Sequence, residues 1–179
     1  MRARFNSNQM QENAPERSVE RAWEYFAGRL PPHDSAPETV RNWFQRLIAL
    51  LQPPDSDPQQ LAAKAAFVFG FDADAARATP ANHAVLAADS ARIVLAELAE
   101  RALVHEGPVR PQEFEGWMNE IAAATGVQGG ELAEPVRIAL TGQRDGAEFG
   151  PLLLLIEDPA ARDLGIPSVR DRIEQFVGV

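Results

Sequence analysis

Apolar residues recur every three or four positions along most of the chain, which is the spacing of one face of an α-helix. Proline or glycine interrupts this recurrence at nearly regular intervals, as expected where one helix ends and another begins. No stretch shows the strict alternation of a half-buried strand. The pattern predicts helices over residues 17–30, 37–51, 58–69, 81–105, 111–124, 130–141, 149–156, 159–164 and 168–177.

The residues between these segments suit helix ends. Ser35 shortly precedes Pro37, and Thr79 directly precedes Pro80, so a capping residue and a proline stand where a helix begins. Residues 72–78 are expected to form a short connector. The pattern therefore predicts an all-α protein of roughly eight to ten helices.

The predicted helices also suggest how the chain is divided. Residues 1–15 are polar and without periodicity, so we expect a flexible N-terminal arm. A Gly-Pro pair at Gly107 breaks the chain after the long predicted helix. We expect a first helical subdomain over 16–106 and a second over 107–179.

The stretch from Gly130 to Ile156 is the most specific part of the sequence. Apolar residues lead into Thr141-Gly142, where a glycine able to adopt positive φ commonly ends a helix. A polar turn over 143–146 follows, and a second apolar helix begins near Phe149. The stretch predicts a helix, a glycine stop, an exposed loop and a helix.

The run PVRIALTGQRDGAEF, residues 135–149, resembles a known pattern. Bacterial glutamyl-tRNA synthetases end in an all-helical anticodon-binding domain whose last subdomain carries a string close to P-L-R-x-A-L-T-G-R-x-x-G-P-E-L. This chain follows it almost position for position, and a weaker similarity extends from about Trp43 to Ile156. The resemblance implies the anticodon-binding fold of a class I glutamyl-tRNA synthetase.

Five RNA-binding residues are implied by motif position. Arg137 would donate hydrogen bonds to a base edge or a phosphate, and Arg144 would be an auxiliary phosphate contact. The backbone of Gly146 and Ala147 and the side chain of Phe149 would hold or stack a splayed base. Arginine planes and aromatic rings stack on unstacked bases for about 1 to 3 kcal/mol each.

A structural interpretation of the same residues stays open. Arg137 would then pair with Glu134 or Glu131, and Phe149 would be a core residue. The chain also departs from the family pattern at two places. Ala147 replaces the usual proline, so the loop is expected to be less rigid. Residues 52–57, QPPDSD, stand where the family has a basic stretch, which weakens the inference for the third anticodon base.

Charge and composition limit the choice of function. The net charge of -9 opposes binding to nucleic acid in general, because lysine and arginine supply much of that affinity. A local arginine patch would still allow a tRNA-binding surface. No apolar run approaches the ~20 residues of a membrane span, and no secretory signal is evident, so we expect a cytoplasmic protein.

Catalytic chemistry is not indicated. The chain has neither the His-x-Gly-His type motif nor the Lys-Met-Ser-Lys type loop of a class I synthetase, and it lacks a phosphate-binding glycine loop with its lysine. Cysteine is absent, and His33, His83 and His105 lack metal-ligand spacing. We therefore expect no enzyme activity of its own, no cofactor and no metal.

Three hypotheses follow from the sequence. The first is a free-standing, non-catalytic protein that binds tRNA of the tRNA-Glu type at the anticodon loop or assists a partner in translation. The second is a helical protein-interaction module that has lost RNA binding, which predicts an exposed apolar patch of several hundred Å². The third is one half of a split synthetase, which predicts a separate catalytic chain as partner.

Overall fold

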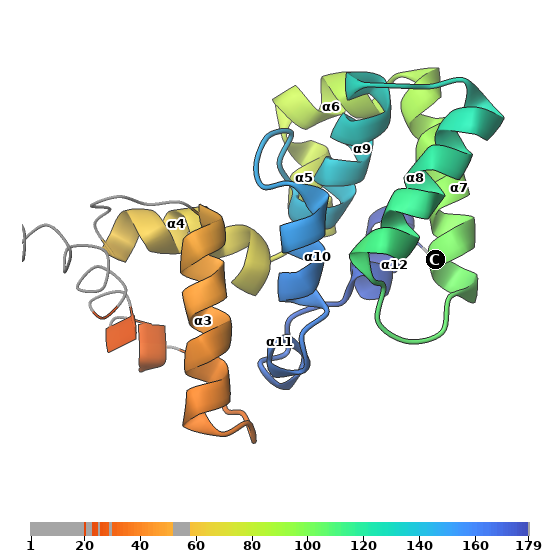
Figure 1. Cartoon of the computed structure of the whole chain (residues 1–179). Helices are drawn as coiled ribbons and strands as arrows, with labels where there is room; N and C mark the ends of the chain where they lie inside the picture. Colours follow the sequence, from red (N-terminus) through yellow and green to blue (C-terminus); the bar gives the residue numbers. More distant parts are fainter. Residues whose placement is uncertain (1–19, 21–22, 25, 29, 52–57, 179) are drawn as a thin grey trace, which may run out of the picture.

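The computed structural model describes residues 20, 23–24, 26–28, 30–51 and 58–178. In these residues it contains ten complete helices and no strand, so the predicted all-α class is confirmed (Figure 1). The helices are α3 (Pro37–Leu51), α4 (Pro58–Phe69), α5 (Ala73–Ala78), α6 (Pro80–Leu86), α7 (Asp89–Val104), α8 (Pro111–Thr125), α9 (Gly130–Thr141), α10 (Phe149–Ile156), α11 (Pro159–Asp163) and α12 (Val169–Val177).

Proline and glycine mark the helix ends much as the sequence predicts. Five of these helices begin on proline, whose fixed φ suits the first turn and whose missing N–H costs nothing there. The residues that follow α8, α9 and α12 are glycines in the left-handed conformation. The first predicted helix is described only in part, with residues 20, 23–24 and 26–27 helical. The predicted arm, residues 1–15, lies outside the described residues.

Two local predictions are wrong. The segment 81–105 is not one helix, because it divides into α6 and α7 where Ala88 adopts an extended backbone with ψ 142°. Alanine favours helix, so the break has no local signal and follows from packing: α6 lies against α5 and α9, whereas α7 lies against α8, α9 and α12. The expected connector at 72–78 contains α5, where the Asp72 side chain accepts a hydrogen bond from the N–H of Ala75 at 2.9 Å.

The core extends from α3 to α12. α7 packs against α8, α9 and α12, and α10 packs against α8 on one side and α3 on another. Figure 1 shows α3 and α4 beside the group of helices that follows them. A buried hydrogen bond joins the two parts, because the indole N–H of Trp43 on α3 donates to the carbonyl of Leu155 on α10 at 2.9 Å. α10 therefore holds the groups together.

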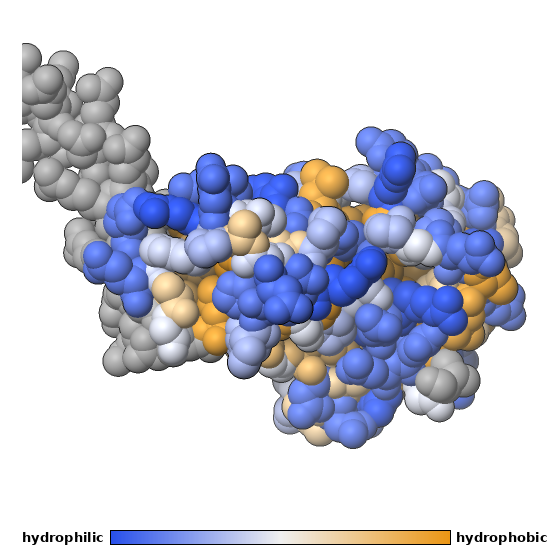
Figure 2. All heavy atoms as spheres, turned by 90° about the horizontal axis from the view of Figure 1, so that it is seen from below, coloured by the Kyte–Doolittle hydropathy of each residue, from blue (hydrophilic) through white to orange (hydrophobic). Residues whose placement is uncertain are grey.

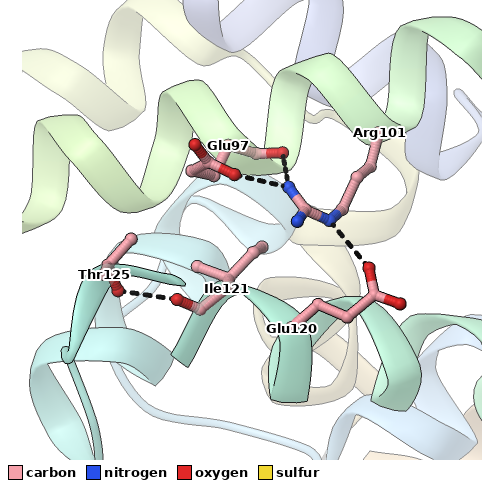
Figure 3. A network of polar contacts seen from close by, with 5 residues as sticks. All are labelled: Glu97, Arg101, Glu120, Ile121 and Thr125. Carbon is pink, nitrogen blue, oxygen red and sulfur yellow. Dashed lines mark hydrogen bonds and ion pairs between the residues drawn. The ribbon is translucent and has the colours of Figure 1, made fainter. Parts of the chain in front are cut away.

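A polar network joins α7 to α8 (Figure 3). Arg101 donates to the carboxylate of Glu97 at 2.7 Å and to that of Glu120 at 3.4 Å. The hydrogen bond to Glu97 is the main reason that the pKa of Arg101 is raised. The contact between Arg101 and Glu120 crosses the predicted boundary at Gly107, since α7 precedes it and α8 follows it. The division into 16–106 and 107–179 stays a prediction.

Glu157 connects the end of α10 to the start of α12. Its carboxylate accepts the N–H of Val169 at 2.8 Å and also a hydrogen bond from the backbone of Val109. Burial raises the pKa of Glu157 above its ordinary value of 4.5, and these hydrogen bonds only partly oppose the effect. Keeping this carboxylate ionised in the folded protein therefore lowers the free energy of unfolding.

The raised pKa predicts that the stability difference between Glu157→Gln and the parent chain depends on pH. Because the folded-state pKa is raised, the contribution of Glu157 to stability is present below its unfolded pKa and is lost as pH rises through the folded pKa. Glutamine keeps an acceptor oxygen for Val169 and does not ionise. We expect the variant to gain stability relative to the parent chain between pH 4.5 and neutral pH. Urea unfolding of both proteins across this range measures the difference, and a constant difference would contradict it.

Candidate nucleic-acid interface

The motif predicted from the sequence occupies one end of α9 and the loop after it. Residues 135–141 form the last part of α9, Gly142 ends it with φ 74°, and α10 begins at Phe149. The segment between them, residues 143–148, is named the motif loop. Its residues are exposed except for Ala147, which is half-buried. The predicted order of helix, glycine stop, exposed loop and helix is confirmed.

Thr141 and Gly142 form the start of this loop. The hydroxyl of Thr141 donates to the carbonyl of Arg137 at 2.8 Å and accepts the N–H of Gln143 at 3.1 Å. The N–H of Gly142 donates to the carbonyl of Ile138 at 2.8 Å. A side chain at Gly142 would be strained by the positive φ and would lie 3.4 Å from the Cβ of Ala76. The Thr-Gly pair therefore ends the helix and sets the direction of the loop.

Arg137 joins four of the five predicted site residues. Its guanidinium donates to the carbonyl of Ala147 and, at 3.4 Å, to that of Gly146. Its Cζ also lies 4.8 Å from the centre of the Phe149 ring, in a cation–π contact. Arg137 therefore braces the far end of the motif loop against α9 and the first residue of α10.

Arg144, the fifth predicted residue, and the Phe149 ring also have other protein partners. Arg144 donates through Nε and a terminal nitrogen to one carboxylate oxygen of Glu134, at 3.1 and 2.8 Å. Glu134, one of the two partners considered for Arg137, thus pairs with Arg144. Phe149 is half-buried, packs against the core and lies 5.3 Å from the ring of Phe114. Phe149 therefore lies at the edge of the core, with part of its side chain still exposed.

A groove of about 920 Å³ opens beside the motif loop. Its walls come from the second half of α3, from α4, from the motif loop and from α10. Apolar residues line most of it, and Leu154 is 61% exposed there. Its two cationic residues are Lys64 and Arg46, of which Arg46 is paired with Asp158. The other lining residues are Ala49, Leu50, Leu51, Phe67, Thr141, Gln143, Asp145, Gly146, Ala147, Glu148, Pro151, Leu152 and Leu155.

Residues 52–57, where the sequence departs from the family pattern, lie outside the described residues.

Figure 2 shows a second view of the surface. On this face the hydrophobic residues among those described appear as separate areas between hydrophilic ones. A single continuous apolar area, as the protein-interaction hypothesis predicts, is not seen among the described residues on this face. Within the same described part of the chain, no His, Cys, Asp and Glu side chains gather as a possible metal site. None of the described helices is both long and apolar enough to span a bilayer.

Sequence reasoning missed two residues that hold the motif in place. Asn82 and Arg172 are the buried polar residues of the described chain, with 3% and 0% of their surface exposed. Both donate hydrogen bonds to carbonyls at the end of α9. The spacing of Arg172 with the apolar Val169 and Phe176 places all three on one helix face, and this signal was available in the sequence.

The all-helical fold and the Thr-Gly stop with its exposed loop are the features that the resemblance to an anticodon-binding domain predicts. Residues 17–176 match the family model described as "Anticodon binding domain", and the chain belongs to that family. A stretch of 59 residues is 41% identical to "Glutamate--tRNA ligase 2" of Acidiphilium cryptum (strain JF-5). That stretch is 31% of this chain and 13% of the ligase, so most of the relative lies outside the similarity.

Proposed function

We propose that the chain binds tRNA at its anticodon loop, through the motif loop and the groove beside it, without catalysing a reaction itself. The observation that supports this most directly is the brace formed by Arg137, which holds an exposed loop at the edge of an apolar groove. Single-stranded RNA is recognised by surfaces of this kind, where unstacked bases enter apolar sites and polar groups read their edges.

The geometry gives the predicted residues separate roles. Arg137 already uses N–H groups on Gly146 and Ala147, so its main role is to position the loop for RNA. Gly146 has φ 144° and no side chain, which lets a base or a sugar approach the backbone closely. Arg144 is exposed and can exchange Glu134 for a phosphate oxygen, because both are acceptors of a guanidinium.

The distribution of charge favours RNA binding through a few local contacts over binding through long-range electrostatic attraction. Lys64 and Arg46 are the cations of the groove, and Asp145 and Glu148 oppose them from the motif loop. The net charge of -9 adds a long-range repulsion of RNA. Binding is therefore expected to depend on a few short contacts in the groove, with a small number of released counterions.

The preferred RNA is proposed to be tRNA-Glu, because the similar stretch belongs to a protein named as a glutamate-tRNA ligase. In this role the domain supplies recognition, and ligation would need a catalytic chain or another translation protein as partner. The predicted cytoplasmic location fits such a role.

Titration with RNA tests the proposal. The full chain is mixed with tRNA-Glu, a non-cognate tRNA and the anticodon stem-loop of tRNA-Glu, at low and moderate salt. We expect saturable binding that favours tRNA-Glu and is kept by the stem-loop. With two or three phosphate contacts, the slope of log K against log salt for single-stranded RNA is expected to be about -2 or shallower.

Two controls give the result its meaning. Arg92→Ala removes an exposed cation of α7 that is paired with Asp89, so it tests for non-specific charge effects away from the groove. Lys64→Ala removes a cation of the groove and should weaken binding more than Arg92→Ala does. Absence of saturable binding at low salt, where electrostatic attraction is strongest, would overturn the proposal.

A further inference from the structure

Two buried polar side chains meet the end of α9 from distant parts of the sequence. Asn82 lies on α6 and Arg172 on α12. Polar side chains are costly to bury unless their hydrogen bonds are satisfied. Both are satisfied here, and both have partners at the same place, the last carbonyls of α9 before the motif loop.

Asn82 holds the carbonyl of the glycine stop. Its side-chain N–H₂ group donates to the carbonyl of Gly142 at 2.9 Å and to that of Ala76 at 2.8 Å. An amide nitrogen carries two hydrogens, so this donor is fully used. The interaction connects the end of α5 to the residue directly before the motif loop.

Arg172 donates to a carbonyl two residues earlier in the chain and ties this helix end to α4. It donates to the carbonyls of Leu140 at 2.7 Å and Phe67 at 2.8 Å, with longer contacts to those of Pro167 at 3.0 Å and Val68 at 3.3 Å. Leu140 is in the last turn of α9 and Phe67 in that of α4, so the guanidinium lies at the negative ends of two helix dipoles. Phe67 and Thr141 also line the groove.

The last carbonyls of a helix have no partner within it, and water satisfies them where the end is exposed. At the end of α9, side-chain donors of the protein bond to these carbonyls in place of water. Both donors are buried and bonded to the carbonyls of Leu140 and Gly142, so they constrain the direction in which the motif loop leaves the helix.

We propose that Asn82 and Arg172 are positioning residues of the RNA-binding site, which set the position of the motif loop and the width of the groove without touching RNA. This inference rests on the function proposed above. It adds that recognition depends on buried residues of α6 and α12 as well as on the motif itself.

Asn82→Ala tests this role against a purely structural one. The variant loses both hydrogen bonds, and we expect about tenfold weaker binding of the tRNA-Glu anticodon stem-loop. We also expect faster hydrogen exchange at the N–H groups of Gly142 and Gln143, whose bonds hold the start of the loop. If this variant does not fold, Asn82→Ser keeps a single donor and gives the same comparison.

Ile121→Val is the matched control, because it removes one buried methyl group from α8 and makes no change at the end of α9. All measurements are made at a temperature where each melting curve shows a folded protein. Equal affinity and equal loop exchange in the Asn82 and Ile121 variants would overturn the inference. If the parent chain binds no RNA, the proposed function fails; loop exchange then decides the positioning role alone, and equal rates in both variants would refute it.

Discussion

Replacement of Arg172 by methionine is expected to lower the free energy of unfolding by about 3 kcal/mol, because it leaves buried helix-end carbonyls without donors. Methionine has a similar length and fills much of the same space, so loss of packing contributes little. The partners that lose their donor are the carbonyls of Phe67, Val68, Leu140 and Pro167. The effect therefore reports on hydrogen bonding together with the contact between the guanidinium and the Phe71 ring, whose centre lies 4.7 Å from Cζ of Arg172.

Two opposing energies determine this magnitude. Hydrogen bonds to a charged group contribute about 1.5–3 kcal/mol each, and Arg172 makes four of them. Against this stands the cost of burying a cation without a directly bonded carboxylate, and that burial lowers the pKa of Arg172 to about 10. Effective penalties for buried ions are several kcal/mol. The residue stays charged at neutral pH, and we expect its hydrogen bonds to outweigh the penalty of burial.

Arg170→Met provides the comparison on the same helix. Arg170 is exposed and pairs with Glu174 at 2.7 Å, so its replacement is expected to cost about 0.5 kcal/mol or less. Urea unfolding at neutral pH measures both variants. A loss below about 1 kcal/mol in Arg172→Met would show that burial of the cation cancels its hydrogen bonds.

The sequence predicted those parts of the fold that local chemistry determines. Pro37, Pro80 and Pro111 begin helices because proline is suited to the first turn, whatever the rest of the chain does. The break at Ala88 could not be predicted in this way. Alanine is the best helix former, so the break reflects packing: α5 lies against α6 but is not among the main neighbours of α7, which packs on α8 and α12, while both helices contact α9.

The candidate site was predictable in its position but not in its contacts. The motif places Arg137, Gly146, Ala147 and Phe149 near one loop, and the structure brings them together. Sequence spacing cannot tell whether an arginine faces solvent or returns to its own backbone, because that depends on the path of the loop. For the same reason the sequence did not assign Glu134 to Arg144.

We expect Arg137→Met to weaken binding of the tRNA-Glu stem-loop by about tenfold or more, because the motif loop loses its brace. The fold is expected to be kept. The variant loses the hydrogen bonds to Gly146 and Ala147 and the contact with the Phe149 ring. The half-exposed position of Arg137 limits the loss of stability to about 1–2 kcal/mol. Without the brace, RNA must order the loop at the cost of binding energy.

Arg137→Lys separates charge from shape. Lysine keeps the cation but lacks the planar fork that reaches two carbonyls and lies on a ring, so it should restore only part of the affinity. Arg144→Met is the control on the loop itself, because it breaks only the exposed pair with Glu134 and should weaken binding about twofold. Titrations with the stem-loop, made beside thermal melts, give all three values. If Arg137→Met binds as the parent chain does, the brace has no part in binding. If Arg144→Met has the larger effect, the charge of Arg144 contributes more to recognition than the brace does.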